Sequence, residues 1–100
     1  MGESKVRRAS RVDANQQAIV AALRAAGASV WYIGLPVDLL CGKNGSTLLL
    51  EVKTLTGKRK PKAAPYTQLQ RDFMASWRGG PVATVTDVES ALRAIETLKG

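Results

Sequence analysis

Residues 36–53, PVDLLCGKNGSTLLLEVK, decide the fold, because they read as two apolar strands joined by a tight turn. The pair Asn44 and Gly45 favours a two-residue hairpin loop, in which both central residues need a positive φ. With that loop, Asp38 faces Glu51 across the hairpin. Lys53 shares a face with Glu51, because side chains alternate along a strand. The stretch therefore predicts two carboxylates and one ammonium group at one end of a hairpin.

This convergence of charge has a cost that needs an explanation. Like charges placed directly opposite each other destabilise a sheet, and at about 5 Å and an effective dielectric constant of about 20 their repulsion is about 3 kcal/mol. Either one carboxyl is protonated or a cation lies between the two. Mg²⁺ fits, because it prefers oxygen ligands and keeps several waters. In the alternative interpretation, Glu51 and Lys53 are solvent-facing residues of an amphipathic strand, Asp38 belongs to a turn, and a one-residue slip separates the carboxyls.

The rest of the chain supplies helices and further strands around the hairpin. The predicted elements are, in chain order, a helix at 13–26, a strand at 28–33, the two hairpin strands, a helix at 66–78, a strand at 82–85 and a last helix from 86. The helix starts rest on capping-box patterns, Asp13 with Gln16, Thr67 with Gln70 and Thr86 with Glu89. This order predicts an α/β fold, αβββαβα, with a mixed four-stranded sheet flanked by helices.

The helices carry apolar stripes at helical spacing, which predict their buried faces. On the helix at 66–78 the stripe is Leu69, Phe73 and Trp77, and Trp77 is assigned to the core rather than to a platform for stacking bases. On the first helix the predicted stripe consists of Ala18, Ile19, Ala22, Leu23 and Ala26.

The charged residues of the hairpin carry a resemblance to a known family. Pro36 and Asp38, followed after twelve residues by Glu51, Val52 and Lys53, resemble the PD-(D/E)XK nuclease signature. From about residue 13 to residue 95 the chain is similar to the small stand-alone phage and bacterial members of the VRR-NUC family. The resemblance implies a restriction-endonuclease-like core, with residues 13–100 as a single nuclease domain. The family usually has Pro and Asp adjacent, and here Val37 intervenes, so we assign Pro36 a structural role.

The resemblance also implies a metal site and a reaction. Asp38, Glu51 and the backbone carbonyl of Val52 would bind Mg²⁺ or Mn²⁺, and Lys53 would orient or help to deprotonate the attacking water. No covalent nucleophile is expected, and the products would carry 5′-phosphate and 3′-hydroxyl ends. Gln70 has two compatible interpretations: it closes a capping box, or it corresponds to the family's motif glutamine near the metal water and the scissile phosphate.

The first helix departs from the family pattern. Family members often carry an acidic residue on this helix, whereas here Asn15, Gln16 and Gln17 are the substitutes. Asn15 lies three and four residues before Ala18 and Ile19, so we expect it on the interior face of the helix, where it either caps the helix locally or reaches into the site.

The composition favours a polyanionic partner. Fifteen Lys and Arg against eight Asp and Glu give a net charge of +7, which indicates nucleic acid before membrane. Residues 1–12 are expected to form a flexible basic arm or the ragged start of the first helix. The basic residues assigned to DNA phosphates are Arg7, Arg8 and Arg11 in this arm and Lys58, Arg59, Lys60 and Lys62 in the loop after Lys53. The alternatives are a solubilising tail and an ordinary solvated loop.

Several classes of site are excluded by composition. The chain has no histidine, which removes His-based triads, imidazole metal ligands and His general bases. Its single cysteine, Cys41, excludes an intramolecular disulfide and is assigned to the core. No apolar run approaches transmembrane length and no secretory leader is recognisable, so we expect an intracellular protein, bacterial or from a phage-infected host, without membrane attachment or a nucleotide cofactor.

Together these features predict a Mg²⁺- or Mn²⁺-dependent DNA endonuclease. By resemblance it would act as a homodimer on branched or duplex DNA and resolve Holliday junctions. Two alternatives remain: a catalytically silent nucleic-acid-binding module of the same fold, and an accessory subunit whose role is protein–protein interaction.

Overall fold

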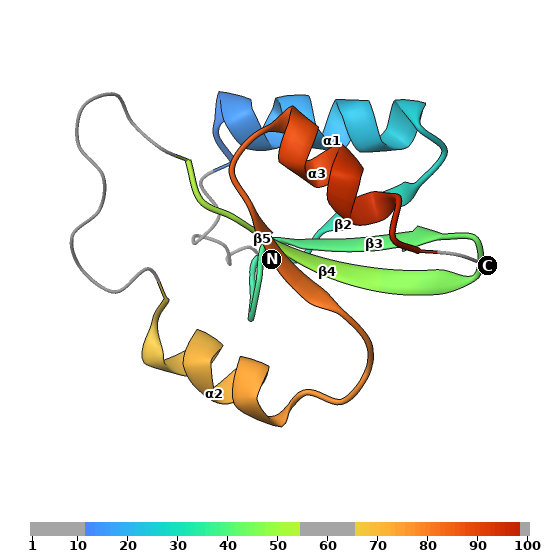
Figure 1. Cartoon of the computed structure of the whole chain (residues 1–100). Coiled ribbons are helices and arrows are strands. Elements are labelled where there is room, and N and C mark those ends of the chain that lie inside the picture. The colour runs from blue at the N-terminus through green and yellow to red at the C-terminus, as the bar shows by residue number, and fades with distance from the viewer. Residues whose placement is uncertain (1–11, 55–65, 99–100) are drawn as a thin grey trace, which may run out of the picture.

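The computed structural model describes residues 12–54 and 66–98, and its elements follow the predicted αβββαβα order. The fold is α/β, with a four-stranded mixed sheet flanked by three helices (Figure 1). The elements are α1 (Ala14–Ala25), β2 (Ser29–Tyr32), β3 (Leu39–Lys43), β4 (Ser46–Val52), α2 (Gln68–Ser76), β5 (Val82–Val85) and α3 (Val88–Ile95).

The hairpin has the predicted register. The sheet order is β2-β3-β4-β5, in which β2, β3 and β4 are antiparallel neighbours and β5 runs parallel to β4. Asn44 and Gly45 form the two-residue loop with φ values of 56° and 80°, as this kind of turn requires. Leu39 pairs with Leu50, so Asp38, one residue before β3, faces Glu51.

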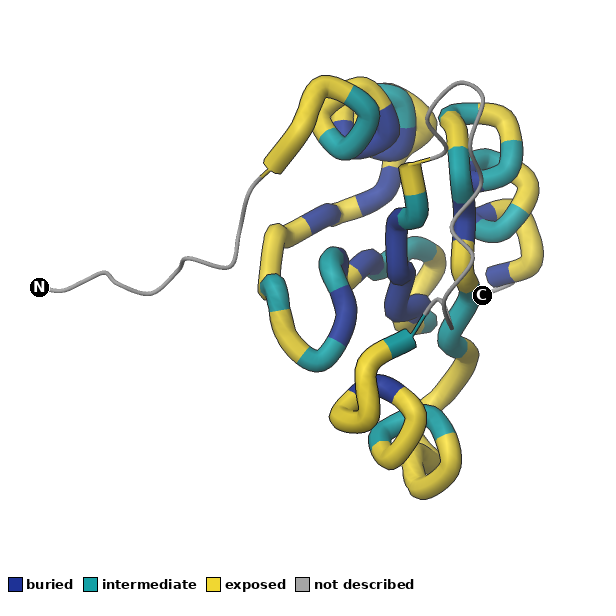
Figure 2. The backbone as a smooth tube through the Cα atoms, turned by 90° about the vertical axis from the view of Figure 1, so that its left-hand side faces the viewer, coloured by how far each residue is buried: buried dark blue, intermediate teal, exposed yellow. Residues whose placement is uncertain are grey.

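The core lies on one face of the sheet. In Figure 1 the helices α1 and α3 lie over one face, and α2 lies on the other side. Figure 2 shows the buried segments of the strands and of α1 and α3 gathered between these layers. The fully buried side chains include Ile19, Leu23, Leu39, Cys41, Leu48, Leu50 and Ile95. Burial raises the pKa of the Cys41 thiol to about 11, which fits the predicted core role of this residue.

The opposite face, which we call the outer face, carries Trp31, Leu40, Leu49, Glu51, Val82 and Thr84. Trp31, Leu40, Leu49 and Val82 are partners across the four strands, and Glu51 is the partner of Thr84. Partners in register point to the same side of a sheet, and successive residues of a strand alternate. Asp38, two residues before Leu40, and Lys53, two residues after Glu51, therefore belong to the outer face as well.

Two local predictions about the helices are only partly right. In the predicted stripe of α1, Ile19 and Leu23 are buried, whereas Ala18 and Ala26 are exposed and Ala22 is half-buried. Val20, outside that stripe, is buried instead, because α1 packs against both α3 and β2. The helix α3 is capped one residue later than predicted, by Asp87. The Asp87 carboxylate accepts a hydrogen bond from the Ser90 N–H at 2.8 Å. In return, the Asp87 N–H donates to the Ser90 hydroxyl at 3.2 Å.

The prediction that Trp77 belongs to the core is wrong. Trp77 is 41% exposed and Leu69 is 51% exposed, whereas the buried residue of α2 is Gln70. The Trp77 ring packs on Phe73, with ring centroids 5.1 Å apart, and lies against the backbone of Gly79, where a Cβ would come within 2.3 Å of the ring. Periodicity identified the stripe, but α2 lies on the far side of the sheet and turns part of that stripe to the surface.

Candidate functional site

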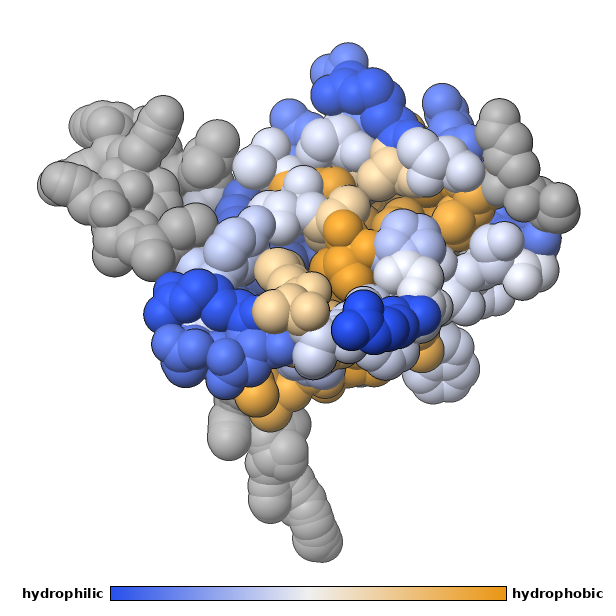
Figure 3. Space-filling view, turned by 60° about the horizontal axis from the view of Figure 1, so that its bottom comes forward, coloured by the Kyte–Doolittle hydropathy of each residue, from blue (hydrophilic) through white to orange (hydrophobic). Residues whose placement is uncertain are grey.

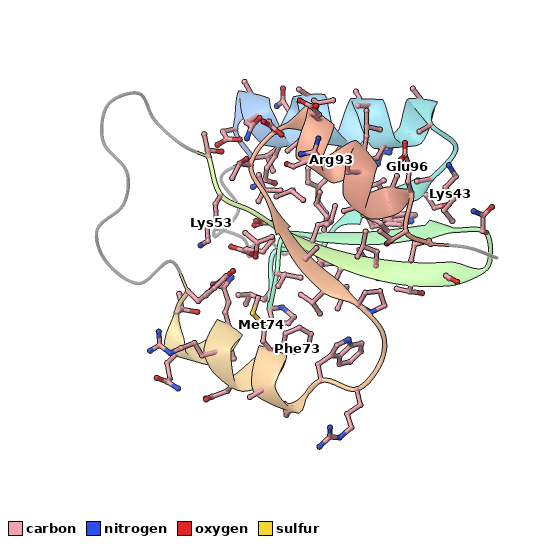
Figure 4. All side chains as sticks on the ribbon, viewed as in Figure 1. Lys43, Lys53, Phe73, Met74, Arg93 and Glu96 are labelled. Carbon is pink, nitrogen blue, oxygen red and sulfur yellow. The ribbon has the colours of Figure 1, made fainter. Side chains whose placement is uncertain are left out.

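Three charged side chains meet on the outer face at the end of the hairpin. Asp38 Oδ2 accepts a hydrogen bond from the Val52 N–H at 2.8 Å. Glu51 Oε2 lies 3.1 Å from Lys53 Nζ, and Glu51 is only 5% exposed. Figure 4 shows Lys53 reaching from the end of β4 toward the side on which α2 lies. The structure thus brings together the two carboxylates and the ammonium group that the hairpin pattern predicts.

Glu51 keeps one oxygen without a partner. Its Oε1 is buried and receives no hydrogen bond from the part of the chain that the structure describes. Leaving a buried polar atom unsatisfied costs about 1–3 kcal/mol, and more for a charged group. The ion pair with Lys53 offsets part of the cost of burying the Glu51 charge, but it leaves Oε1 open to a further ligand.

The environment of Asp38 disfavours the charged form of its carboxyl group. Burial raises the pKa of Asp38 from 3.8 to about 6, because a carboxylate loses hydration there. The hydrogen bond from the Val52 N–H opposes this rise in pKa, whereas the neighbouring Glu51 carboxyl adds to it and the Lys53 charge lowers it. The pair therefore favours either a proton on Asp38 or a cation between the carboxyls.

The turn before β3 aims Asp38 at the site. The N–H groups of Ile33 and Gly34 both donate to the Asp38 carbonyl, at 2.9 and 3.3 Å. Val37, the residue that separates Pro36 from Asp38, is fully buried and so anchors the turn, while the adjacent Asp38 side chain reaches the Val52 N–H.

Gln70 connects α2 to this turn. Its Nε2 donates to the Pro36 carbonyl at 3.1 Å, and its Oε1 accepts from the Thr67 N–H at 3.2 Å. The Gln70 N–H in turn donates to Thr67 Oγ1 at 3.1 Å, which completes the predicted capping box. Gln70 is 8% exposed. It therefore fixes the start of α2 against the turn that carries Asp38.

Asn15 braces the chain just beyond the site. Its Nδ2 donates to Thr54 Oγ1 at 3.2 Å and to the Thr86 carbonyl at 2.9 Å. The Thr54 hydroxyl donates to Asp13 Oδ2 at 3.0 Å. These bonds join the start of α1 to the residue that follows Lys53, so the amide of Asn15 is directed to Thr54 and Thr86 rather than to the two carboxyls.

Two neighbours of the site were missed in the sequence. Lys53 Nζ lies 5.5 Å from the centre of the Tyr66 ring, and the Tyr66 hydroxyl lies 2.7 Å from Thr84 Oγ1. Thr84 is the β5 partner of Glu51. Tyr66 directly follows a basic segment that is predicted to be a loop, so its sequence position gave no sign of a role at the site. Thr84 was missed because no sequence motif reports the register of the parallel β4–β5 pair.

The seven predicted phosphate-binding residues lie outside the described residues. The structure does place the two residues that flank the segment 55–65. Thr54 directly follows Lys53, and Tyr66 lies against the Lys53 ammonium group. Both ends of the segment that contains Lys58, Arg59, Lys60 and Lys62 are therefore attached beside the carboxylate pair.

An apolar groove lies next to the site. It has a volume of about 500 Å³ and is lined by Leu35, Pro36, Leu69, Asp72, Phe73 and Ser76. Figure 3 shows apolar side chains gathered on this side of the molecule, with strongly hydrophilic side chains around them. In Figure 4, Phe73 and Met74 point from α2 toward the sheet. The groove lies between the turn residues Leu35 and Pro36 and the side of α2 that carries Leu69 and Phe73.

Comparison with known proteins gives no relative: no protein-family model, no curated protein and no solved structure matches the chain. In the described ranges 12–54 and 66–98, no helix is long and apolar enough to cross a membrane. Function is therefore inferred from the chemistry of the site.

Proposed function

We propose that the protein is a metal-dependent DNA endonuclease, with a VRR-NUC-like nuclease domain of the PD-(D/E)XK type over residues 13–100. The observation that carries this proposal is the pair formed by the half-buried Asp38 carboxyl and the buried Glu51 carboxyl, with Glu51 Oε1 unpartnered in the described residues and Lys53 beside it. Two carboxyls that face each other across a hairpin, with the pKa of Asp38 raised, are a costly arrangement in a sheet. A bound cation would relieve the repulsion between the carboxyls, and this relief would contribute to the affinity for the cation.

The donor set fits a small hard cation. The described residues hold no group of three or more His, Cys, Asp or Glu side chains that could bind a metal. Mg²⁺ is commonly held by only one or two carboxylates, with waters and phosphate oxygens as its other ligands. Asp38 and Glu51 meet that requirement, and Mn²⁺ accepts similar oxygen ligands. A bound Mg²⁺ or Mn²⁺ would stabilise charge on the phosphoryl group and lower the pKa of a bound water.

The backbone of Val52 supports a third protein ligand. In an antiparallel pair of strands, the N–H and the C=O of one residue both hydrogen-bond to the same neighbouring strand, so both groups point to the same edge of their own strand. The Val52 N–H points to Asp38. The Val52 carbonyl therefore lies on the same edge, where it can join Asp38 and Glu51 as a ligand.

Lys53 has a role in each state of the site. Without a divalent ion its ammonium group is the counter-ion of Glu51. When a metal shares the Glu51 carboxylate, the same ammonium group is available to bind a water or a phosphate oxygen, and it offsets the negative charge that develops in phosphodiester hydrolysis. Gln70 holds the start of α2 against the Asp38 turn and so keeps the carboxyl in place.

Charge and exposed apolar surface support the proposed partners. The net charge of +7 attracts a polyanion, and the basic segment 55–65 is attached at both ends beside the site. Cutting both strands of a junction requires two sites, so we include a homodimer in the proposal. The exposed side chains Leu35, Leu69 and Trp77 near the apolar groove are candidates for its interface.

The test is cleavage of an end-labelled four-way junction, a linear duplex and a single strand with Mg²⁺, Mn²⁺ or EDTA. We expect paired, symmetric cuts in the junction that require the metal and are lost in Glu51→Gln and Lys53→Ala. Glu89→Gln is the matched control, because Glu89 forms an exposed ion pair with Arg93 on α3. DNA that is shifted but uncut with every metal would refute the nuclease and favour a binding module.

A further inference from the structure

Lys53 makes two contacts through its ammonium group. Glu51 Oε2 lies 3.1 Å from its Nζ, and the centre of the Tyr66 ring lies 5.5 Å from it. An ammonium group within about 6 Å of an aromatic ring centre is attracted by the negative face of the ring. The two contacts differ in kind, because Glu51 is a proposed metal ligand and the Tyr66 ring carries no net charge.

Tyr66 is itself fixed to the fold. Its hydroxyl lies 2.7 Å from Thr84 Oγ1 on β5, and its carbonyl accepts a hydrogen bond from Arg71 Nη1 at 3.0 Å. The next residue, Thr67, caps α2. The ring is therefore tied to the strand beside Glu51 and to the start of α2, which gives it a defined position over Lys53.

A divalent ion on Glu51 would change the balance between the two contacts. The ion would share the carboxylate that pairs with Lys53 and would repel the ammonium group. A carboxylate in the place of Tyr66 would hold Lys53 but would also compete for the metal, whereas a ring face attracts the ammonium group without offering a ligand. The Tyr66 ring is thus suited to keep Lys53 at the site when Glu51 is engaged.

We propose that Tyr66, fixed by Thr84, is a positioning residue of the site: it holds the Lys53 ammonium group beside the scissile phosphate while Glu51 binds the metal. This inference rests on the proposed nuclease function for its catalytic consequence. The placement of Lys53 by Tyr66 is a property of the chain that can be measured without DNA or cleavage.

The first measurement is NMR of protein labelled with ¹³C-lysine, in which the Lys53 Cε signal is assigned with Lys53→Arg. A ring face shifts the Lys53 Hε protons upfield. We expect this shift in the unmodified chain, in Tyr66→Phe, and in Glu51→Gln with and without Mg²⁺, because the ring remains in each case. In Tyr66→Leu the signal should move to the position of solvent-exposed lysines. Tyr32→Leu is the control, since Tyr32 lies on the edge strand β2.

The second measurement is single-turnover cleavage at saturating DNA. Tyr66→Leu should lower the rate about tenfold to a hundredfold, the cost of displacing a catalytic group by about 1 Å, while its affinity for DNA stays within twofold. Tyr66→Phe should recover most but not all of the rate, because it keeps the ring and the backbone contact with Arg71 but loses the hydroxyl that meets Thr84.

The outcomes separate this inference from the proposed function. An unchanged Lys53 signal in Tyr66→Leu, or loss of the upfield shift in Glu51→Gln with Tyr66 in place, would overturn the inference whether or not the protein cuts DNA. An unmodified protein that cuts DNA and a Tyr66→Leu variant with the full rate would overturn it as well, and would leave the nuclease proposal intact. Failure of the unmodified protein to cut would refute the nuclease and leave the NMR test of Lys53 placement valid.

Discussion

Replacing Asp38 by Asn should stabilise the protein while it removes the proposed metal ligand. Asn has the shape of the protonated carboxyl, and its Oδ1 can still accept the hydrogen bond from the Val52 N–H. The substitution removes the charge that burial and Glu51 disfavour. Functional sites often contain residues whose replacement makes the protein more stable, and Asp38 is expected to be one of them.

The magnitude follows from the pKa of Asp38. Its rise from 3.8 to about 6 corresponds to an upper limit of about 3 kcal/mol, because one unit is worth about 1.4 kcal/mol. Asp38 is only half-buried, so solvent screening reduces this to about 1–2 kcal/mol. Below about pH 4 the carboxyl is protonated in both folded and unfolded chains, and its contribution to stability is fully present. That contribution is lost as the pH rises through about 6.

The assay is urea unfolding followed by circular dichroism at pH 4 and at pH 8, with Glu89→Gln as the control. Asp38→Asn should match the unmodified protein at pH 4 and should exceed it by about 1–2 kcal/mol at pH 8, a midpoint shift of about 1 M urea. The exposed control pair should change stability by less than about 0.5 kcal/mol. Added Mg²⁺ should stabilise the unmodified protein and not Asp38→Asn. Lower stability of Asp38→Asn at pH 8 would contradict this prediction, because it would show that the fold favours the carboxylate.

Three further results are expected. Lys53→Met should abolish cleavage yet bind Mn²⁺ about three- to tenfold more tightly by calorimetry, because it removes a positive charge 3.1 Å from Glu51 Oε2; weaker binding would contradict the proposed competition. Mn²⁺ affinity should fall about tenfold per pH unit below pH 6, because Asp38 must lose its proton to bind the metal. A flat profile between pH 5 and 7 would exclude Asp38 as a ligand. Leu69→Glu should convert a dimer to a monomer in light scattering, because it places a charge in the exposed apolar surface of the groove; an unchanged mass would place the interface elsewhere.

The hairpin could be predicted because its determinants are local. Asn44 and Gly45 specify the loop, the loop specifies the register, and the register places Asp38 opposite Glu51. The order of helices and strands followed from caps and periodicity for the same reason.

The remaining features depend on contacts between segments far apart in the sequence. The spacing of Leu69, Phe73 and Trp77 shows which side of α2 is apolar, but it does not show whether another element covers that side. Tyr66 and Thr84 become neighbours of Lys53 only through the pairing of β4 with β5. The unpartnered oxygen of Glu51 likewise follows from packing rather than from any motif.

Binding of a divalent cation by Asp38 and Glu51 is tested most directly by an anomalous difference map from crystals of the protein soaked in Mn²⁺. We expect a peak within about 2–2.3 Å of carboxylate oxygens of both residues and of the Val52 carbonyl, with Lys53 released from Glu51. A map without a peak between the carboxyls at saturating Mn²⁺, with the ion pair of Lys53 and Glu51 intact, would contradict this expectation.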